Sequence, residues 1–215
     1  MENGDRAAVR PRTAILIDLS AEYPISTVVS TLRDLNVAIA TCDHPSSIRE
    51  PVKVGHNVDA VDPFLWIVLG DSSSALTRQT SELVQLGVAH LVVLRTMYGG
   101  TIGPAYLGRG TACFRCYGAR LTSHGHEVDV DEPRPGRSVL DLLWESTLAR
   151  EVMALVAANE VPGLAALSVN HVLECDGLMN NVARRRVLRN PNCANCQAIG
   201  LPLIASWQPS GTATP

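Results

Sequence analysis

The first 95 residues of the chain alternate between short apolar runs and segments with apolar residues at helical spacing. Ala14–Leu19 is apolar at every position except Asp18, a pattern that is typical of a strand buried on both faces. Apolar residues then recur every three or four positions from Ile25 to Leu35, as on one face of a helix, and Val37–Cys42 returns to a strand pattern. This order predicts a βαβ unit with parallel strands and a right-handed crossover.

A second unit of the same kind follows residues 43–63, which are rich in Pro, Ser, Asn and Asp and are expected to form an irregular connection. Phe64–Leu69 and Val88–Leu94 are apolar enough for buried strands. Between them, Ser72, Ser73 and Ser74 are candidate N-caps and Gly87 is a candidate C-terminal residue of a helix. Four strands with two helices predict half of a doubly wound α/β sheet.

The pattern changes beyond residue 95. The glycine-rich stretch 98–106 predicts a bent antiparallel hairpin or a bulged strand. Ser138 and Asp141 open a long helix with an apolar stripe that reaches Val156. Residues 167–173 and 182–188 can pair as a final hairpin. We therefore expect an α/β fold with a truncated Rossmann-like, mostly parallel sheet and C-terminal antiparallel hairpins.

Length and composition favour one domain. The chain has 215 residues, of which 46% are hydrophobic and only 4% aromatic, so a single core built mainly from aliphatic side chains is expected. The isolated cysteines Cys42 and Cys175 lie on apolar segments and are expected to be buried. We predict a disordered N-terminus over 1–12, one domain over 13–204 and a flexible tail over 205–215.

Charge and hydropathy disfavour two classes of partner. A net charge of -3 gives no reason to expect a concentrated basic surface for nucleic acid. No stretch of about 18 apolar residues offers a membrane span, and the first apolar run is too short for the core of a signal peptide. We therefore expect a cytoplasmic protein without nucleic-acid or membrane partners.

Two Cys-x-x-Cys pairs, Cys113/Cys116 and Cys193/Cys196, carry the strongest chemical signal. Each pair can present two thiolates from one turn, and two such turns supply the four sulfurs of a tetrahedral structural zinc site. A redox pair and two disulfides are the alternatives, but a reducing compartment favours the metal. Because four sulfurs leave no position for water, the zinc is expected to be structural and not catalytic.

The sequence GPAYLGRGTACFRC, residues 103–116, resembles the Gly-Pro…Gly…Thr-Ala-Cys-x-x-Cys segment of the ubiquitin-activating-enzyme-like superfamily, which includes the ThiF-type adenylyltransferases. It looks most like the ocin-ThiF branch, whose members are partners of YcaO-type cyclodehydratases that form azoline and thiazole rings in ribosomal peptides. Residues 184–196 resemble the basic strand, proline and second cysteine turn of that branch. The resemblance covers about residues 60–197 and implies a ThiF-like domain with bound zinc.

The chain departs from the pattern of active relatives, which carry a Gly-x-Gly-x-x-Gly turn whose backbone amides bind the phosphates of ATP. Residues 18–24 read DLSAEYP, with no glycine and with two carboxylates that would repel a triphosphate. ATP binding is therefore not expected. By the resemblance, Asp43 and Asp71 are vestigial ribose- and magnesium-binding residues, although each also fits an Asp that caps the turn after a strand.

The resemblance implies a non-catalytic zinc scaffold in thiazole/oxazole-modified (bacteriocin-type) peptide biosynthesis, which docks a YcaO-type cyclodehydratase and helps to assemble the complex or to present the precursor peptide. Arg184, Arg185 and Arg186 are candidates for binding the peptide or the partner; a solvated strand edge that discourages aggregation is the alternative. An ATP-dependent adenylyltransferase acting on a peptide carboxyl terminus, and a zinc-stabilised subunit unrelated to peptide maturation, are the competing functions. The superfamily also implies a homodimer.

Overall fold

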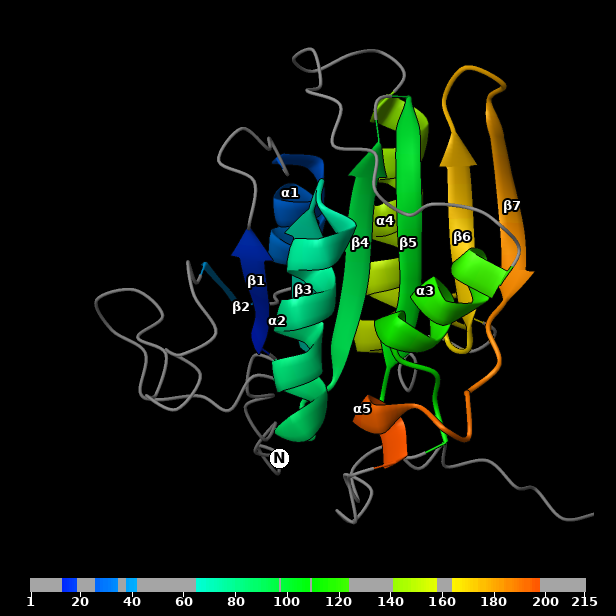
Figure 1. Ribbon diagram of the computed structural model, residues 1–215. Coiled ribbons are helices and arrows are strands. Elements are labelled where there is room, and N and C mark those ends of the chain that lie inside the picture. Colours follow the sequence, from blue (N-terminus) through cyan, green and yellow to red (C-terminus); the bar gives the residue numbers. More distant parts are fainter. Residues whose placement is uncertain are drawn as a thin grey trace, which may run out of the picture.

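The computed structural model describes residues 13–18, 26–34, 38–41, 65–96, 98–108, 110–123, 141–157 and 164–197. Within these ranges, one seven-stranded sheet has the strand order β2-β1-β3-β4-β5-β6-β7 (Figure 1). The strands are β1 (Thr13–Asp18), β2 (Ala38–Thr41), β3 (Leu65–Gly70), β4 (His90–Thr96), β5 (Gly99–Tyr106), β6 (His171–Asp176) and β7 (Asn181–Arg186). The helices are α1 (Ser26–Asp34), α2 (Ser73–Gln85), α3 (Phe114–Ser123), α4 (Asp141–Ala157) and α5 (Ala194–Gln197).

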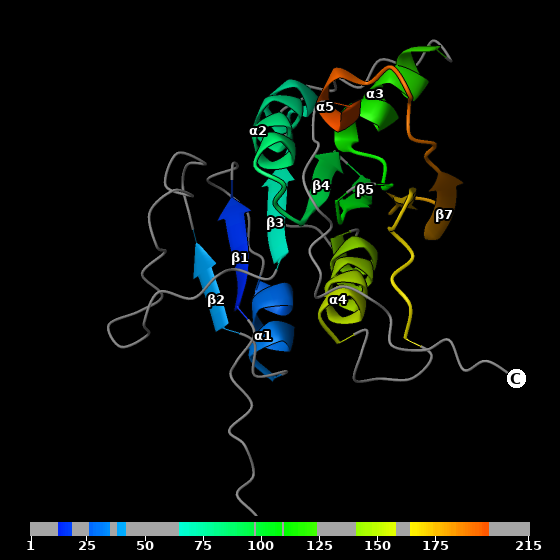
Figure 2. The same cartoon turned by 90° about the horizontal axis from the view of Figure 1, so that it is seen from below.

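The first four strands form the parallel half of the sheet. β1 pairs in parallel with β2 and with β3, and β3 pairs in parallel with β4. The chain moves in opposite directions along the sheet in its two βαβ units, so right-handed crossovers put α1 and α2 on opposite faces. Figure 2 shows this arrangement, with α1 and α4 on one face and α2, α3 and α5 on the other. The predicted strands and helices of this half are confirmed.

The remaining strands form an antiparallel half. β4 pairs with β5, β5 with β6, and β6 with β7, all antiparallel. Short turns join β4 to β5 and β6 to β7, and turns of this length can connect only antiparallel neighbours. The described sheet is therefore mixed, with three parallel and three antiparallel pairs, which corrects the expectation of a mostly parallel sheet.

β5 is the bulged strand that the glycine-rich stretch predicts. Its pairing with β4 shifts between Leu91 and Val93, opposite Gly103 and Pro104. A proline has no N–H to donate and is tolerated in a strand at such a bulge. Near the other end of β5, a Cβ on Gly99 would lie 1.9 Å from the carbonyl oxygen of Cys175, so β5 can approach β6 only with glycine at this position.

Apolar side chains fill both spaces between the sheet and its helices. Successive residues of β3 point to opposite faces: Trp66 packs in the cluster that includes α2 and α3 residues, and Ile67 packs in the cluster that includes α1 and α4 residues. Trp144 and Leu148, from the predicted stripe of α4, are fully buried in the second cluster. The continuous apolar runs of the sequence thus correspond to strands covered on both faces.

β6 begins later than the sequence pattern predicts, at His171 and not at residue 167. The amides of Leu167 and Ser168 donate to the buried carboxylate of Glu151 on α4, at 2.8 and 2.9 Å, and so are not available to a neighbouring strand. Asn170 then adopts a φ of 55°, which interrupts an extended chain. The predicted hairpin itself is confirmed, since β6 and β7 pair from His171 to Asp176.

Several expectations concern residues outside the described ranges. These are the terminal segments 1–12 and 205–215, the connection 43–63, and the residues Cys42 and Asp43. Among the helices that the structure does describe, none has the combination of length and apolar character that crossing a membrane requires.

His90, the first residue of β4, is completely buried between the sheet and the cluster around α2 and α3. Its Nδ1 lies 2.8 Å from the carbonyl oxygen of Val88, and its ring stacks on Tyr106 at a centroid distance of 5.2 Å. Nε2 has no hydrogen-bond partner among the described residues. Burial without a counter-charge disfavours the protonated ring and lowers the pKa of His90 from 6.5 to about 4.

This burial predicts a loss of stability in acid. Below pH 6.5 the unfolded chain binds a proton at His90 and the folded chain does not, so the free energy of unfolding falls by about 2 kcal/mol between pH 7 and pH 5 from this group alone. His90→Phe, which keeps a ring beside Tyr106 and cannot titrate, is expected to remove this part of the pH dependence. Urea denaturation of both proteins at pH 7 and pH 5 measures it, and equal losses in the two proteins would contradict the prediction.

Candidate metal centre

In the first cysteine pair, Cys113 directly precedes α3 and Cys116 lies in the first turn of that helix. The Thr111 hydroxyl shapes the connection: it donates to the carbonyl oxygen of Gly108 at 2.8 Å and accepts from the Leu107 amide at 3.0 Å. The carbonyl oxygen of Cys113 accepts from the Cys116 amide at 3.0 Å, which closes the turn. Both cysteines are therefore held by one compact turn at the start of a helix.

In the second pair, Cys193 directly precedes α5 and Cys196 lies within it, and the pair depends on a turn at Asn190. The Asn190 carbonyl accepts from the Cys193 amide at 3.0 Å, and its side-chain oxygen accepts from the Asn192 amide at 2.9 Å. The guanidinium of Arg189 donates to the carbonyl oxygen of Cys196 at 2.8 Å. These bonds hold the short helix α5 to the segment that leaves β7.

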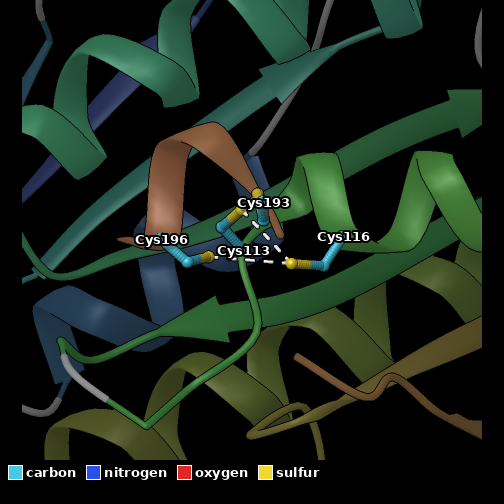
Figure 3. A group of neighbouring side chains, drawn as sticks. All are labelled: Cys113, Cys116, Cys193 and Cys196. Atoms are coloured by element: carbon cyan, nitrogen blue, oxygen red, sulfur yellow. Dashed lines mark hydrogen bonds between the residues drawn. The ribbon is translucent and has the colours of Figure 1, made fainter. Parts of the chain in front are cut away.

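The four cysteine sulfurs point toward one another between α3 and α5 (Figure 3). Sγ of Cys113 lies 3.8 Å from Sγ of Cys116 and 3.7 Å from Sγ of Cys193, and Sγ of Cys116 lies 3.6 Å from Sγ of Cys196. All four sulfurs lie within 4.8 Å of one another. A zinc ion with four Zn–S bonds of about 2.3 Å has sulfurs about 3.8 Å apart. The distances therefore fit tetrahedral metal coordination.

Burial and charge support a metal over the two alternatives. The cysteines are free thiols, so the structure does not contain the two disulfides that the spacing also allows. The four residues are at most 5% exposed, whereas a redox Cys-x-x-Cys pair needs an accessible sulfur. The Cys113 thiol donates to the Cys116 sulfur, which raises the pKa of Cys113 and lowers that of Cys116. A thiolate already favoured at Cys116 gives a cation its first ligand.

Three polar contacts around the sulfurs were not found by sequence reasoning. The Asn190 amide donates to Sγ of Cys116 at 3.4 Å, the Asn195 side chain donates to Ser81 of α2 at 2.6 Å, and the Ala112 amide donates to the side chain of Asn170 at 2.8 Å. They connect the cluster to α2 and to the start of β6. The run Asn190-Pro191-Asn192 did contain a signal, because Asn and Pro favour turns, but nothing local connects Asn170 to residue 112.

Among the described residues, the structure does not bring Asp71 or the arginines of β7 into this cluster. Asp71 follows β3 directly and is exposed, without a hydrogen bond or ion pair to any described residue. The three arginines lie on β7 and are all exposed. Arg185 forms an ion pair with Glu174 at 3.1 Å, so one of the three candidate binding residues already has a partner within the sheet.

The fold and the cysteine cluster define the class of the protein: an α/β protein with a mixed seven-stranded sheet and four buried cysteines that can hold a metal ion. No protein-family model matches the sequence, and no curated protein matches it. Solved structures do match the fold. Two are a heterocyclase in complex with its substrate and cofactor, with a TM-score of 0.59 at 13% identity, and the heterocyclase TruD, with 0.57 at 13%.

A third match is MccB of E. coli with selenomethionine MccA, which has a TM-score of 0.59 at 10% identity. Each of the three comparisons covers 86% of this chain. The chain spans 25% and 27% of the two heterocyclase chains and 66% of the MccB chain. At these identities the likeness establishes a common fold and no more.

Proposed function

We propose that the protein is a zinc-stapled, non-catalytic scaffold that works with a YcaO-type cyclodehydratase on ribosomal precursor peptides. Its role would be to dock the ATP-using partner and to help present the peptide for ring formation. The observation that carries the proposal is the fold shared with two heterocyclase chains and MccB, in a chain whose residues 18–24 contain no glycine.

The spacing of the sulfurs supports zinc as the bound metal. Four thiolates in a tetrahedron are a typical donor set for zinc, and three sulfur–sulfur separations of 3.6 to 3.8 Å match the separation of about 3.8 Å that Zn–S bonds of about 2.3 Å produce. Cys113, Cys116, Cys193 and Cys196 would be its ligands, and they fill every position of a tetrahedron. The zinc would therefore join the start of α3 to the start of α5 and would not activate water.

The sequence after β1 supports a role without nucleotide chemistry. Phosphates are usually bound where glycines let backbone amides approach them at the start of a helix. Residues 18–24 offer no glycine, and Asp18 and Glu22 add negative charge. We assign Asp43 and Asp71 at most a vestigial role in nucleotide binding.

Further parts of the proposal follow from the fold and the thiols. We place the protein in the cytoplasm, where reducing conditions keep four cysteines available for a metal. We assign residues 13–204 to one ThiF-like domain whose parallel half is Rossmann-like. Association as a homodimer is also proposed.

The test combines ring formation with nucleotide binding. Under the proposal, the zinc-loaded chain raises the rate at which a YcaO-type cyclodehydratase encoded beside it forms rings in its precursor peptide, as measured by the loss of water in mass spectra. The chain alone shows no heat of binding with ATP and magnesium in calorimetry. Micromolar affinity for ATP, or unchanged ring formation, would contradict the scaffold role.

A second candidate is an adenylyltransferase that activates a carboxyl terminus. It is supported by structures of the same fold that were solved with nucleotides: MccB with ATP and MccB with AMPCPP. Asp71, exposed after β3, would then be free to reach magnesium. Exchange of labelled pyrophosphate into ATP in the presence of the precursor peptide distinguishes the two candidates, because only the adenylyltransferase catalyses it.

A further inference from the structure

β7 forms one edge of the described sheet and is open to solvent along most of its length (Figure 1). Long exposed edges are templates for pairing with another chain, because their outer N–H and C=O groups have no neighbour. In β7, five of six residues are exposed, and only Ala183 is partly covered. This edge therefore differs from β3, β4 and β5, which lie between other strands.

The register identifies the outward-facing groups of β7. The amide of Val187 donates to the carbonyl oxygen of Asn170 at 2.9 Å, so residue 187 faces β6. Antiparallel pairs alternate between bonded and non-bonded positions, which makes Val182, Arg184 and Arg186 the residues whose backbone groups face away from β6. A bond of 2.6 Å from the Arg120 guanidinium to the Arg186 carbonyl agrees with this assignment and already occupies that one group.

The same three residues set the chemistry of the edge. Their side chains lie on one face of the sheet. Val182 is opposite Cys175 and Arg184 is opposite Leu173, and Cys175 and Leu173 both pack in the cluster that includes α1 and α4 residues. Nε of Arg184 donates to the Leu167 carbonyl oxygen at 3.3 Å and its guanidinium lies 3.2 Å from Nδ1 of His171, and neither partner carries a negative charge that would cancel that of Arg184. The Arg186 side chain has no partner among the described residues.

We propose that an extended acidic peptide segment adds to this edge as a further strand, with its backbone bonded to Val182 and Arg184. Strand addition gives affinity through the backbone and specificity through alternate side chains. In the peptide, acidic residues at two alternate positions would lie beside Arg186 and Arg184 and complement their charge. An apolar residue two positions further along would pack beside Val182. The residue between the two acids faces Arg185, which Glu174 already neutralises, and needs no charge.

Charge also selects the occupant. Self-pairing of β7 from two copies would put arginines beside arginines, and like charges on neighbouring strands are destabilising. The inference rests on the proposed function in one respect: the segment would belong to the precursor peptide that the scaffold presents. The edge would then be the place where the peptide is held.

The probe is a fluorescein-labelled, capped peptide, Thr-Glu-Thr-Glu-Thr-Val-Thr, added to the zinc-loaded full chain and followed by fluorescence anisotropy. Two versions carry N-methyl groups on alternate amides, one on each edge of the peptide strand. Strand addition predicts that only one version loses affinity, by about tenfold for two lost hydrogen bonds. Equal affinities of the two N-methylated versions would overturn the proposal, as would equal binding of a peptide with lysine in place of glutamate.

Variants of the chain locate the site. Arg186→Glu is expected to weaken binding, whereas Arg78→Glu, at an exposed arginine of α2, is the matched control and is expected to leave it unchanged. Amide exchange should slow at Val182 and Arg184 when the peptide binds. Equal affinities of the two variants would overturn the assignment to β7.

Other occupants give different results, and each would overturn the proposal. The chain's own run Glu127–Glu132 also alternates acids and valines; binding of the probe only after its acids are replaced by amides would assign the edge to that run. A dimer that Arg186→Glu strengthens would assign it to a second copy. If the peptide binds at β7 but ring formation does not change, the β7 site is supported and the scaffold function is contradicted. If the chain enhances ring formation equally with and without Arg186→Glu, the scaffold function is supported and the β7 site is contradicted.

Discussion

Replacement of Cys116 and Cys196 by serine is expected to abolish metal binding and to lower the free energy of unfolding by on the order of 10 kcal/mol at saturating zinc. One ligand is lost from each pair, so neither Cys-x-x-Cys turn retains two thiolates. Because the stability of a whole domain is about 5–15 kcal/mol, a loss of this size leaves little of the folded state. Native mass spectrometry measures zinc per chain, and urea denaturation measures the free energy.

The loss is expected to begin at α5. This helix has only four residues, packs against α2, and is attached to the rest of the chain through the Asn190 turn and the sulfurs. A helix of this length has no stability of its own in water. Amide exchange of the metal-free protein should therefore be fastest over 193–197, while β3 and β4 in the centre of the sheet stay protected longest.

Cys175→Ala is the matched control. Cys175 is also a buried free cysteine, but it lies on β6 outside the cluster, where burial raises the pKa of its thiol to about 11. This variant is expected to bind one zinc per chain, as the unaltered protein does. The zinc assignment would be wrong if the double serine variant and Cys175→Ala had the same metal content, or if a chelator left the free energy of unfolding unchanged.

The cysteine cluster could be predicted from the sequence because the number and type of metal ligands can be recognised without knowing how the chain folds. Cys113 and Cys193 are 80 positions apart, but a structural zinc site with tetrahedral coordination requires four ligands, and two Cys-x-x-Cys turns supply four sulfurs. The parallel half of the sheet could likewise be predicted from the local pattern of apolar residues. Runs such as residues 65–69 are apolar on both faces, which only a strand between two helical layers requires.

Other features depend on contacts that local pattern does not contain. α3 was missed although Phe114, Tyr117 and Leu121 recur at helical spacing, because the cysteines read as a turn next to a strand and the helix extends only to Ser123. The exposed strand β7 fitted two interpretations, since an arginine run describes a solvated edge and a binding edge equally well. Its register against β6 separates the outward-facing residues from the others, and register is a property of the pair of strands.

Glu151 shows the same limit most clearly. Its residue type suggests an exposed charge, since glutamate is seldom fully buried. In the structure its carboxylate is completely buried, is paired with Arg150, and accepts the amides of Leu167 and Ser168. The partners lie 16 and 17 positions away and contribute backbone groups, which have no side-chain pattern in the sequence. This carboxylate fixes the path of the chain into β6.

Glu151→Ala is therefore expected to lower the free energy of unfolding by about 4 kcal/mol. Two backbone donors lose their acceptor in a site that water does not reach readily, and each orphaned donor costs about 1–3 kcal/mol. Urea denaturation of the zinc-loaded variant measures the loss. Glu151→Gln keeps the shape and one acceptor oxygen and is expected to lose about half as much, whereas Glu82→Ala, on the solvent-facing side of α2, is expected to change the free energy by less than about 0.5 kcal/mol. If Glu151→Ala were no more destabilising than Glu82→Ala, the carboxylate would not be what holds the residues before β6 in place.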